Sequence, residues 1–159
     1  MISRRQARRM ALQILFANEF LKEDVETVSR RVLESLEEKP SPFTRELVEK
    51  TTQGRDKLDR LIEEHLKNWD INRIALLDRV LIRMALAEML YFPDIPVEVT
   101  INEALEIGKE FCNLKSRRFI NGILDSIYKD LRKRNQLIKQ CKTNAKHQSG
   151  SEVKKGNVM

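Results

Sequence analysis

Apolar residues recur three and four positions apart along most of the chain, up to about residue 134. That spacing places them on one side of an α-helix, which completes a turn about every 3.6 residues. Strict alternation of apolar and polar residues, the pattern of a half-buried strand, is absent. The pattern therefore predicts an all-α fold of six or seven helices.

Capping and turn residues indicate where each helix begins and ends. Ser3 with Gln6 matches a capping box, and Ser41 before Pro42 is typical of a helix start. Further expected caps are Asp24, Asp70 and Ser116. The expected helices span about residues 3–21, 24–39, 42–69, 70–92, 96–111 and 116–134. Gly54 is a weak point within the third of them, because glycine disfavours a helix interior.

The segment from Ile71 to Met89 is the most apolar and is expected to form the central, most buried helix. Gly122 lies inside the last helix, where glycine costs about 1 kcal/mol relative to alanine, and it predicts a close backbone approach. After about Arg134 the pattern dissolves into Lys, Gln, Asn, Ser and Gly. We therefore expect one helical domain over residues 1–134 and a disordered basic tail over residues 135–159.

Composition adds that the positive charge is unevenly distributed. The 159 residues carry a formal net charge of +6. Residues 1–128 hold 21 Lys and Arg against 22 Asp and Glu, a net charge of −1, whereas residues 129–159 hold nine against two, a net charge of +7. Because the body of the chain is nearly neutral, a dense basic cluster within it is a local feature that indicates a binding partner.

Several classes of function lack support in the sequence. No apolar run approaches the roughly 18 residues of a membrane span, and the N-terminus lacks a secretory signal, so we expect a cytoplasmic protein without a membrane partner. Cys112, Cys141, His65 and His147 are scattered too widely for a disulfide framework or a metal site. Phosphate loops and hydrolase motifs are absent. We expect no enzyme activity, cofactor or metal.

The first expected helix begins with four arginines, Arg4, Arg5, Arg8 and Arg9. At about 100° per residue they fall within an arc of about 140°, opposite a stripe of small and apolar residues. The positive end of the helix dipole disfavours cations there, whereas guanidinium groups and free N–H groups both bind phosphate. The cluster indicates a nucleic-acid contact; the alternative is a solvated face that pairs with neighbouring Glu side chains.

A second basic cluster stands at the expected start of the last helix. Lys115, Arg117 and Arg118 are followed at once by Phe119. If both helix starts lie on one side of the molecule, they form a positive groove in which Phe119 stacks on an unpaired base of single-stranded RNA. Phe119 also fits the apolar stripe of its helix, so a core position is the alternative.

Leu12, Phe16 and Phe20 stand four residues apart on the arginine side of the first helix. They form either an additional core contact or an exposed apolar seam beside the basic cluster. For Phe16 the second interpretation implies a protein partner that docks next to the nucleic acid. Both interpretations stay open at this level.

Several segments stand in a recognisable order. The first, over residues 5–16, reads Arg-Gln-Ala-Arg-Arg-Met-Ala-Leu-Gln-Ile-Leu-Phe, and later ones include Ile-Asn-Glu-Ala at 101–104 and Phe-Ile-Asn-Gly-Ile-Leu-Asp at 119–125. Further blocks lie at 69–74, 78–85 and 95–97. Together they resemble the NusB family of bacterial transcription antitermination factors over about residues 4–130.

The resemblance implies two small helical bundles and a protein that binds RNA without turnover. NusB-like proteins pair with the small-subunit ribosomal protein that doubles as NusE, and the pair holds the boxA sequence of nascent RNA in the RNA polymerase antitermination complex, which supports ribosomal RNA synthesis. The RNA contacts implied at matching positions are Arg4, Arg5, Arg8, Arg9, Lys115, Arg117, Arg118 and Phe119. The implied NusE contacts are Phe16 and Asp78, where Phe16 replaces a more usual Tyr.

Two other functions fit parts of this pattern. A helical adaptor that binds only proteins would keep its arginines solvated. The NusB-like RNA-recognition module of some ribosomal RNA methyltransferases requires a following catalytic domain, which this sequence lacks. Whether the free protein forms a homodimer is left open. Under the leading hypothesis, replacing Arg5 and Arg8 with Ala weakens boxA binding at least about tenfold without a change in melting.

Overall fold

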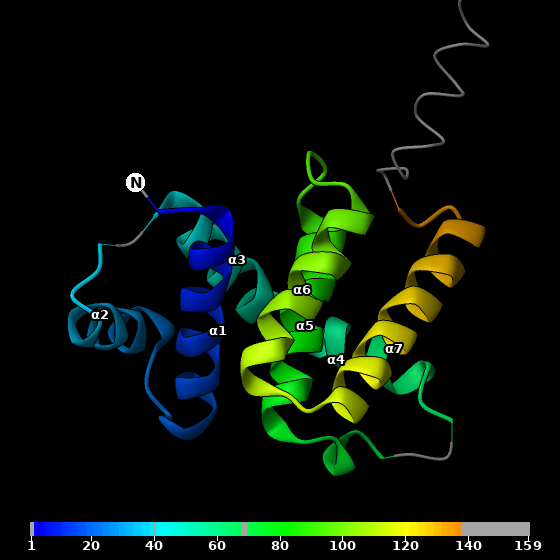
Figure 1. Cartoon of the computed structure of the whole chain (residues 1–159), viewed down its shortest axis with the longest axis horizontal. Helices are drawn as coiled ribbons and strands as arrows, with labels where there is room; N and C mark the ends of the chain where they lie inside the picture. Colours follow the sequence, from blue (N-terminus) through cyan, green and yellow to red (C-terminus); the bar gives the residue numbers. More distant parts are fainter. Residues whose placement is uncertain (1, 40, 68–69, 138–159) are drawn as a thin grey trace, which may run out of the picture.

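The computed structural model describes residues 2–39, 41–67 and 70–137, and these residues form seven α-helices and one short 3₁₀ turn (Figure 1). The elements are α1 (Arg4–Phe20), α2 (Val25–Ser35), α3 (Pro42–Gln53), α4 (Arg55–Glu64), the turn η1 (Ile71–Arg73), α5 (Leu76–Tyr91), α6 (Val97–Phe111) and α7 (Leu114–Lys133). The prediction of an all-α fold with six or seven helices is confirmed.

Local capping sets the first three helix starts as predicted. Ser3 and Gln6 form a complete capping box at α1, in which each side chain bonds the backbone of the other residue. The Asp24 side chain accepts from the backbone N–H of Thr27 at the start of α2, and the Ser41 side chain caps α3 in the same way. These short-range hydrogen bonds satisfy N–H groups that have no partner within the helix.

The predicted long helix over residues 42–69 is divided at Gly54, which ends α3 and begins α4. A Cβ atom on Gly54 would lie 2.9 Å from the Tyr91 hydroxyl oxygen and 3.2 Å from the Lys50 carbonyl oxygen. The absence of a side chain therefore lets Tyr91 of α5 pack against the junction. Asp70, the expected cap of the next helix, caps η1 instead, and α5 begins at Leu76.

Two expectations for the last helix are wrong. Asn113, and not Ser116, is the N-cap of α7, and its side chain accepts from the Ser116 backbone N–H at 2.8 Å. Lys115 consequently lies inside the first turn of α7. Gly122 is exposed, with no neighbouring atom within 4 Å of the place where a Cβ would stand, so no close backbone approach occurs there.

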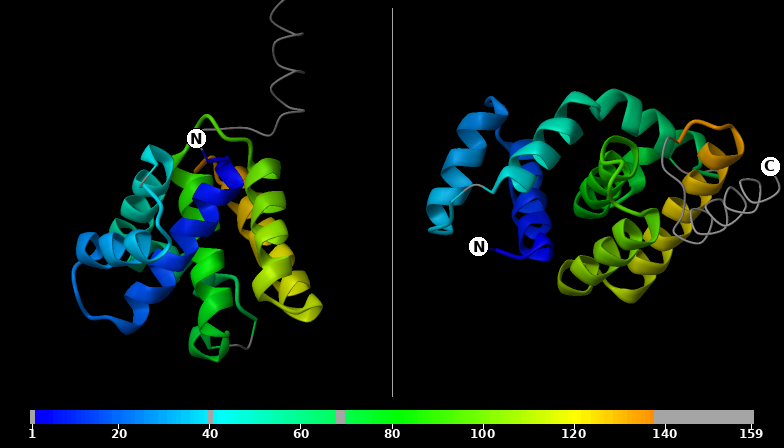
Figure 2. Two further views of the ribbon diagram at one scale, coloured as in Figure 1. Left: turned by 60° about the vertical axis from the view of Figure 1, so that its left-hand side comes forward. Right: turned by 90° about the horizontal axis from the view of Figure 1, so that it is seen from above.

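The central helix is α5, as the apolar run predicts, and every residue from Val80 to Met89 is buried. α1, α3, α4, α6 and α7 all contact it, so one core joins the two halves of the molecule. Helices α1, α2 and α3 lie to one side of α5, whereas α6 and α7 lie to the other (Figures 1 and 2). Although they lie on different sides of α5, α1 and α6 also contact each other directly. That contact shapes the basic face.

The described chain continues slightly beyond the expected domain end. The backbone N–H of Gln136 bonds to the Leu131 carbonyl oxygen at 2.9 Å, and Leu137 packs against the core. The remainder of the expected basic tail, residues 138–159, lies outside the described residues. Among the described helices, none has the length and apolar character needed to cross a membrane.

Candidate nucleic-acid interface

Three of the four arginines of α1 lie within ion-pair distance of glutamates of α6, and for Arg8 the contact is a long one, with its Nη1 4.0 Å from a Glu103 oxygen. Arg5 donates from Nε and Nη2 to the two carboxylate oxygens of Glu103, at 2.8 and 3.1 Å. Arg9 donates from Nη2 to Glu110. These side chains are partly exposed, with Arg5 at 48% and Glu103 at 19%. The Glu partners that the alternative interpretation of the arginine cluster expects are therefore present on this part of the surface.

Arg8 differs from the exposed phosphate contact that the pattern predicts, because its residue is 4% exposed. Its Nε and Nη2 donate to the two oxygens of Glu88 on α5, at 2.6 and 3.2 Å. The Thr100 hydroxyl of α6 also donates to Glu88. Breaking a buried pair of this kind by removing one partner costs about 3–5 kcal/mol. Arg8 therefore fixes α1 to the core.

Arg4 lies over an aromatic ring. Its guanidinium carbon stands 4.5 Å from the centroid of the Phe43 ring on α3, and that of Arg8 stands 5.2 Å away from the same ring. Phe43 in turn meets Phe92 edge to face, with ring centroids 5.4 Å apart. This cation–π contact holds the exposed Arg4 near the N-terminus of α1 without neutralising its charge.

The basic residues at the start of α7 are less neutralised. Lys115 and Arg118 are exposed, and in the described part of the chain no carboxylate lies within 4.0 Å of the cationic groups of Lys115, Arg117 or Arg118. Arg117 is partly buried, and its Cγ would stand 3.3 Å from a Cβ on Gly108. Phe119 is 36% exposed, so its ring is only partly available for stacking on a base.

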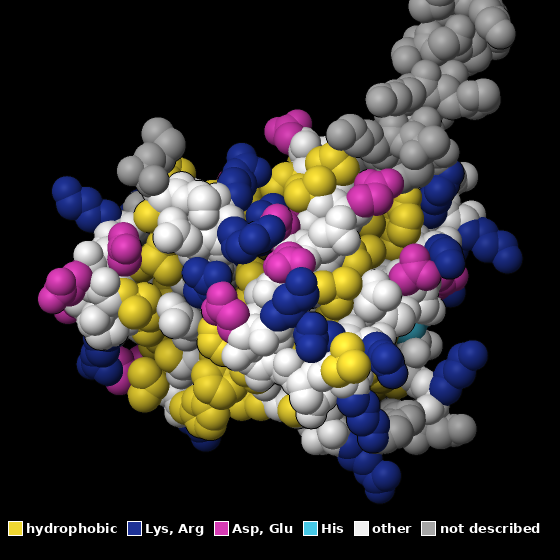
Figure 3. Space-filling model, in the orientation of Figure 1, with side chains coloured by type: hydrophobic (Ala, Val, Ile, Leu, Met, Phe, Trp, Pro, Cys, Tyr) yellow, Lys and Arg dark blue, Asp and Glu magenta, His cyan; other side chains and the backbone are white. Residues whose placement is uncertain are grey.

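Both basic clusters reach one open hollow over the outer face of α6, which we call the α6 groove. Its volume is about 570 Å³. Its charged lining residues are Arg5 of α1, Glu103, Glu106 and Lys109 of α6, and Arg117 and Arg118 of α7. Figure 3 shows Lys and Arg side chains in a band across this face, with Asp and Glu side chains between them. The structure thus brings Arg5 together with Arg117 and Arg118.

The carboxylates in the α6 groove are held in the charged form. Hydrogen bonding by Arg5 lowers the pKa of Glu103 below its ordinary value, although partial burial acts the other way. Hydrogen bonding by Lys109 likewise lowers the pKa of Glu106. Glu103 also raises the pKa of Arg5. The sequence prediction did not name the α6 glutamates that pair with α1. The signal that could have identified them is spacing, because Glu103 and Glu110 are seven residues, or two helical turns, apart and so lie on one face of the helix.

The two residues implied as NusE contacts have different surroundings. Phe16 is partly buried and meets Phe20 edge to face, with centroids 5.1 Å apart, while Phe20 is 62% exposed. Leu12 is buried at 1% exposure and belongs to the core, whereas Phe20 leaves an exposed apolar edge at the end of the seam. Asp78 is buried at 7% exposure and accepts a hydrogen bond from the Cys112 thiol at 3.0 Å. Burial, with help from Asp78, raises the pKa of Cys112 to about 12.

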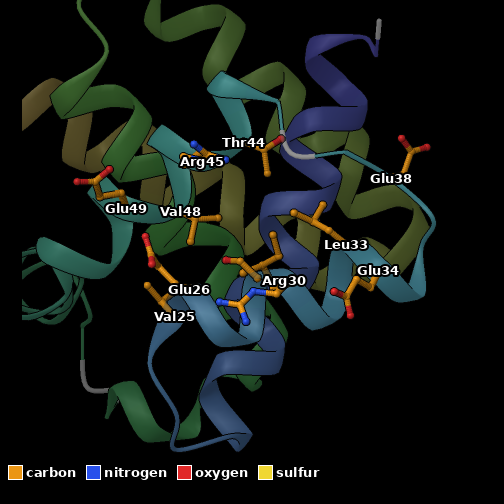
Figure 4. Close-up of a pocket in the computed structure, with 12 residues that line it drawn as sticks. Val25, Glu26, Arg30, Leu33, Glu34, Glu38, Thr44, Arg45, Val48 and Glu49 are labelled. Carbon is orange, nitrogen blue, oxygen red and sulfur yellow. The ribbon is translucent and has the colours of Figure 1, made fainter.

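A second hollow of about 580 Å³ lies between α1, α2 and α3 (Figure 4). Its lining includes the apolar Ile14, Leu33 and Val48 together with Glu and Arg side chains. None of the predicted site residues lines it. Within the described residues, no group of three His, Cys, Asp or Glu side chains is placed to hold a metal ion.

Comparison with known proteins shows which family and which folds this chain resembles. The NusB family model matches residues 5–129. The transcription antitermination protein NusB of Bacillus subtilis (strain 168) is 42% identical over 130 residues, which cover 82% of this chain and 98% of that protein. Among solved structures, T. maritima NusB matches with a TM-score of 0.73 and 34% identity, over 80% of this chain and 92% of that chain.

A chain in the crystal structure of a plectonemic RNA supercoil matches with a TM-score of 0.75 and 26% identity, over 82% of this chain and 96% of that chain. The fold likeness therefore extends over about four fifths of this chain and nearly the whole of each matched chain. Because the family model spans most of the sequence and the Bacillus relative is matched over nearly its whole length, this chain belongs to the NusB family.

Proposed function

We propose that the protein is a transcription antitermination factor that binds boxA-type single-stranded RNA together with the ribosomal protein NusE. In that role it supports ribosomal RNA transcription within the RNA polymerase antitermination complex. Membership of the NusB family supports this function. The observation that carries the RNA-binding step is the position of Arg5 and Arg118 on one groove, although the two residues stand on different helices far apart in the sequence.

The proposed roles of the basic residues differ according to how exposed each side chain is. The proposed phosphate contacts are Arg4, Arg5, Arg9, Lys115, Arg117 and Arg118. Arg8 acts from beneath, because its pair with Glu88 fixes the helix that carries the other arginines. Phe119, at 36% exposure, offers the edge of its ring to an unstacked base.

The proposed NusE surface is the seam at the C-terminal end of α1. Phe16 and Phe20 form an aromatic pair with an exposed edge, the kind of contact that protein interfaces favour. Asp78, in the first turn of α5, is buried and accepts a hydrogen bond from Cys112, so its proposed role at the NusE surface is structural support from beneath it. NusE bound there extends the RNA-facing surface, and linkage then raises the affinity of the pair for RNA.

The test is fluorescence anisotropy of a labelled boxA RNA, with and without NusE, at two salt concentrations. Each phosphate contact on single-stranded RNA contributes about −0.7 to the slope of log affinity against log salt. We expect Arg118→Ala to reduce the slope by about that amount and to weaken binding. Arg60→Ala is the matched control, because Arg60 is exposed on α4 outside the groove. Equal losses in both variants contradict the site.

A protein-only adaptor is the second candidate, and one observation favours it. Arg5, Arg8 and Arg9 already have carboxylate partners within the protein, so the first basic cluster is largely neutralised. This candidate predicts NusE binding without any RNA affinity at low salt. The same titration therefore separates the two functions.

We also infer that the protein acts by binding and not by catalysis, and that it acts in the cytoplasm. The similar relatives are named as transcription antitermination proteins, and bacterial transcription takes place in that compartment. A search for turnover of boxA RNA after prolonged incubation tests the first inference: intact RNA is the expected result, and cleaved or modified RNA contradicts it.

A further inference from the structure

We propose that Glu103 and Glu110 of α6 compete with RNA phosphates for Arg5 and Arg9, so that α6 limits how tightly the groove binds RNA. The inference rests on the function proposed above and adds two acidic residues to its site. It assigns to α6 a role in affinity that its basic neighbours on α1 and α7 do not have.

The geometry of the Arg5 pair requires competition at one edge of its guanidinium group. Arg5 presents Nε and Nη2 to the two oxygens of Glu103, which is the same two-pronged contact that arginine makes with phosphate. A guanidinium held in this way has its best donors occupied. Phosphate therefore binds Arg5 through that edge only by displacing Glu103. Glu110 holds Arg9 through a single bond from Nη2, so phosphate competes with Glu110 for that one group.

The two surface pairs can open, whereas the pair beneath them cannot. The side chains of Arg9 and Glu110 are 32% and 45% exposed, and those of Arg5 and Glu103 are 48% and 19% exposed, so solvent and ligand reach both pairs. In the Arg8 pair with Glu88 the exposed fractions are 5% and 2%. Exchange of a glutamate partner for a phosphate is thus confined to Arg5 and Arg9, the two paired arginines that are exposed on α1.

A displaced Glu103 also opposes RNA by its charge. A glutamate carboxylate is ionised at neutral pH, and Glu103 and Arg5 line the same groove, so the negative charge stays beside the bound phosphate after Arg5 has left it. Glu106 lines that groove too, but it bonds to Lys109 at 2.8 Å and not to an arginine of α1. Glu106 therefore provides the comparison between general repulsion and direct competition.

The experiment measures boxA RNA binding by anisotropy with Glu103→Gln, Glu110→Gln and the control Glu106→Gln. A glutamine amide oxygen still accepts one hydrogen bond from Arg5, so positioning is retained while the charge is removed. We expect Glu103→Gln to tighten binding by up to about fivefold, more than Glu106→Gln does, and the two pair variants to multiply when combined. Equal effects of Glu103→Gln and Glu106→Gln, or weaker binding by Glu103→Gln, overturn the competition.

A second readout separates this inference from the proposed function. Carbon-13 NMR of the Glu103 carboxyl group follows its pKa in the free protein and in the RNA complex. The pKa is expected to rise on RNA binding, because Arg5 leaves the carboxylate. An unchanged Glu103 pKa in a formed complex overturns the competition and leaves the RNA function standing. If neither the wild type nor any variant binds RNA, the proposed function fails, and the inference fails with it.

Discussion

Arg5 and Arg8 lie about one turn apart on α1, yet only Arg5 reaches solvent. Arg8 is enclosed by Glu88 of α5, Thr100 of α6 and Phe43 of α3, and Thr100 donates to the same carboxylate that holds Arg8. A buried charge is tolerated when its partners satisfy its hydrogen bonds, and it becomes costly when one partner is removed.

We predict that Arg8→Ala lowers the free energy of unfolding by about 3–5 kcal/mol, because Glu88 would remain buried without its arginine. Urea denaturation measures this change. Arg5→Ala is the control and is expected to leave the unfolding midpoint unchanged, since its pair lies at the surface. From the sequence alone, no change in melting is expected when Arg5 and Arg8 are both replaced. The buried Arg8 pair leads us to expect a loss of stability instead. An unaltered midpoint for Arg8→Ala contradicts the structural role.

The sequence could identify the arginine cluster but not the separate roles within it. Its arc of about 140° spans the border between surface and core, and a helical wheel does not show where that border falls. The partner of Arg8 lies 80 positions away, and the partner of Arg5 lies 98 positions away. Such contacts depend on how α1 packs against α5 and α6, which no local pattern encodes.

Cys112 provides a prediction about reactivity. Burial raises the pKa of its thiol to about 12, and the Asp78 carboxylate adds to the effect. Because only the thiolate reacts, we expect Cys112 in a Cys141→Ser variant to react with iodoacetamide at pH 8 at least about tenfold more slowly than in the urea-unfolded chain. Asp78→Asn should increase the rate in the folded protein. Equal rates in folded and unfolded protein contradict the assignment.

At the scale of whole elements, helix starts were predictable where a cap is local. Ser3, Asp24 and Ser41 each bond to a backbone group three residues ahead, so the signal lies within one turn. The start of α7 was misplaced because Asn113 and Ser116 are both good caps in the same short segment. The break at Gly54 needed the position of Tyr91 on another helix.

Replacement of glycine by alanine is expected to have opposite effects on stability at Gly122 and at Gly54. Gly122→Ala should stabilise the protein by about 0.5–1 kcal/mol, because the residue is exposed within α7 and alanine is the better helix former. Gly54→Ala should destabilise it, because the added methyl group would meet the Tyr91 hydroxyl and the Lys50 carbonyl. Urea unfolding midpoints measure both changes, and stabilisation by Gly54→Ala contradicts the packing at the α3–α4 junction.

At the scale of the whole molecule, the fold places α6 between the two basic helix starts. The sequence supplied both clusters and the condition that they share one side, but their convergence on the α6 groove depends on the packing of α1, α6 and α7. The same packing introduces the carboxylates Glu103 and Glu106, which make the groove mixed in charge. A chain with a nearly neutral body thus presents a limited cationic face.

Because that face is limited, we propose that the basic residues of segment 138–159 add RNA affinity without sequence preference. Residues 138–159 contain five Lys and one Glu. Removing them should weaken binding of every RNA by a similar factor and make the salt slope shallower by about 0.7 for each lysine that contacts a phosphate. Anisotropy titrations of boxA and scrambled RNA with both chain lengths, with and without NusE, test this expectation. Loss of the boxA preference, or of the tightening by NusE, in the shorter chain would place part of the recognition in the tail and not in the groove.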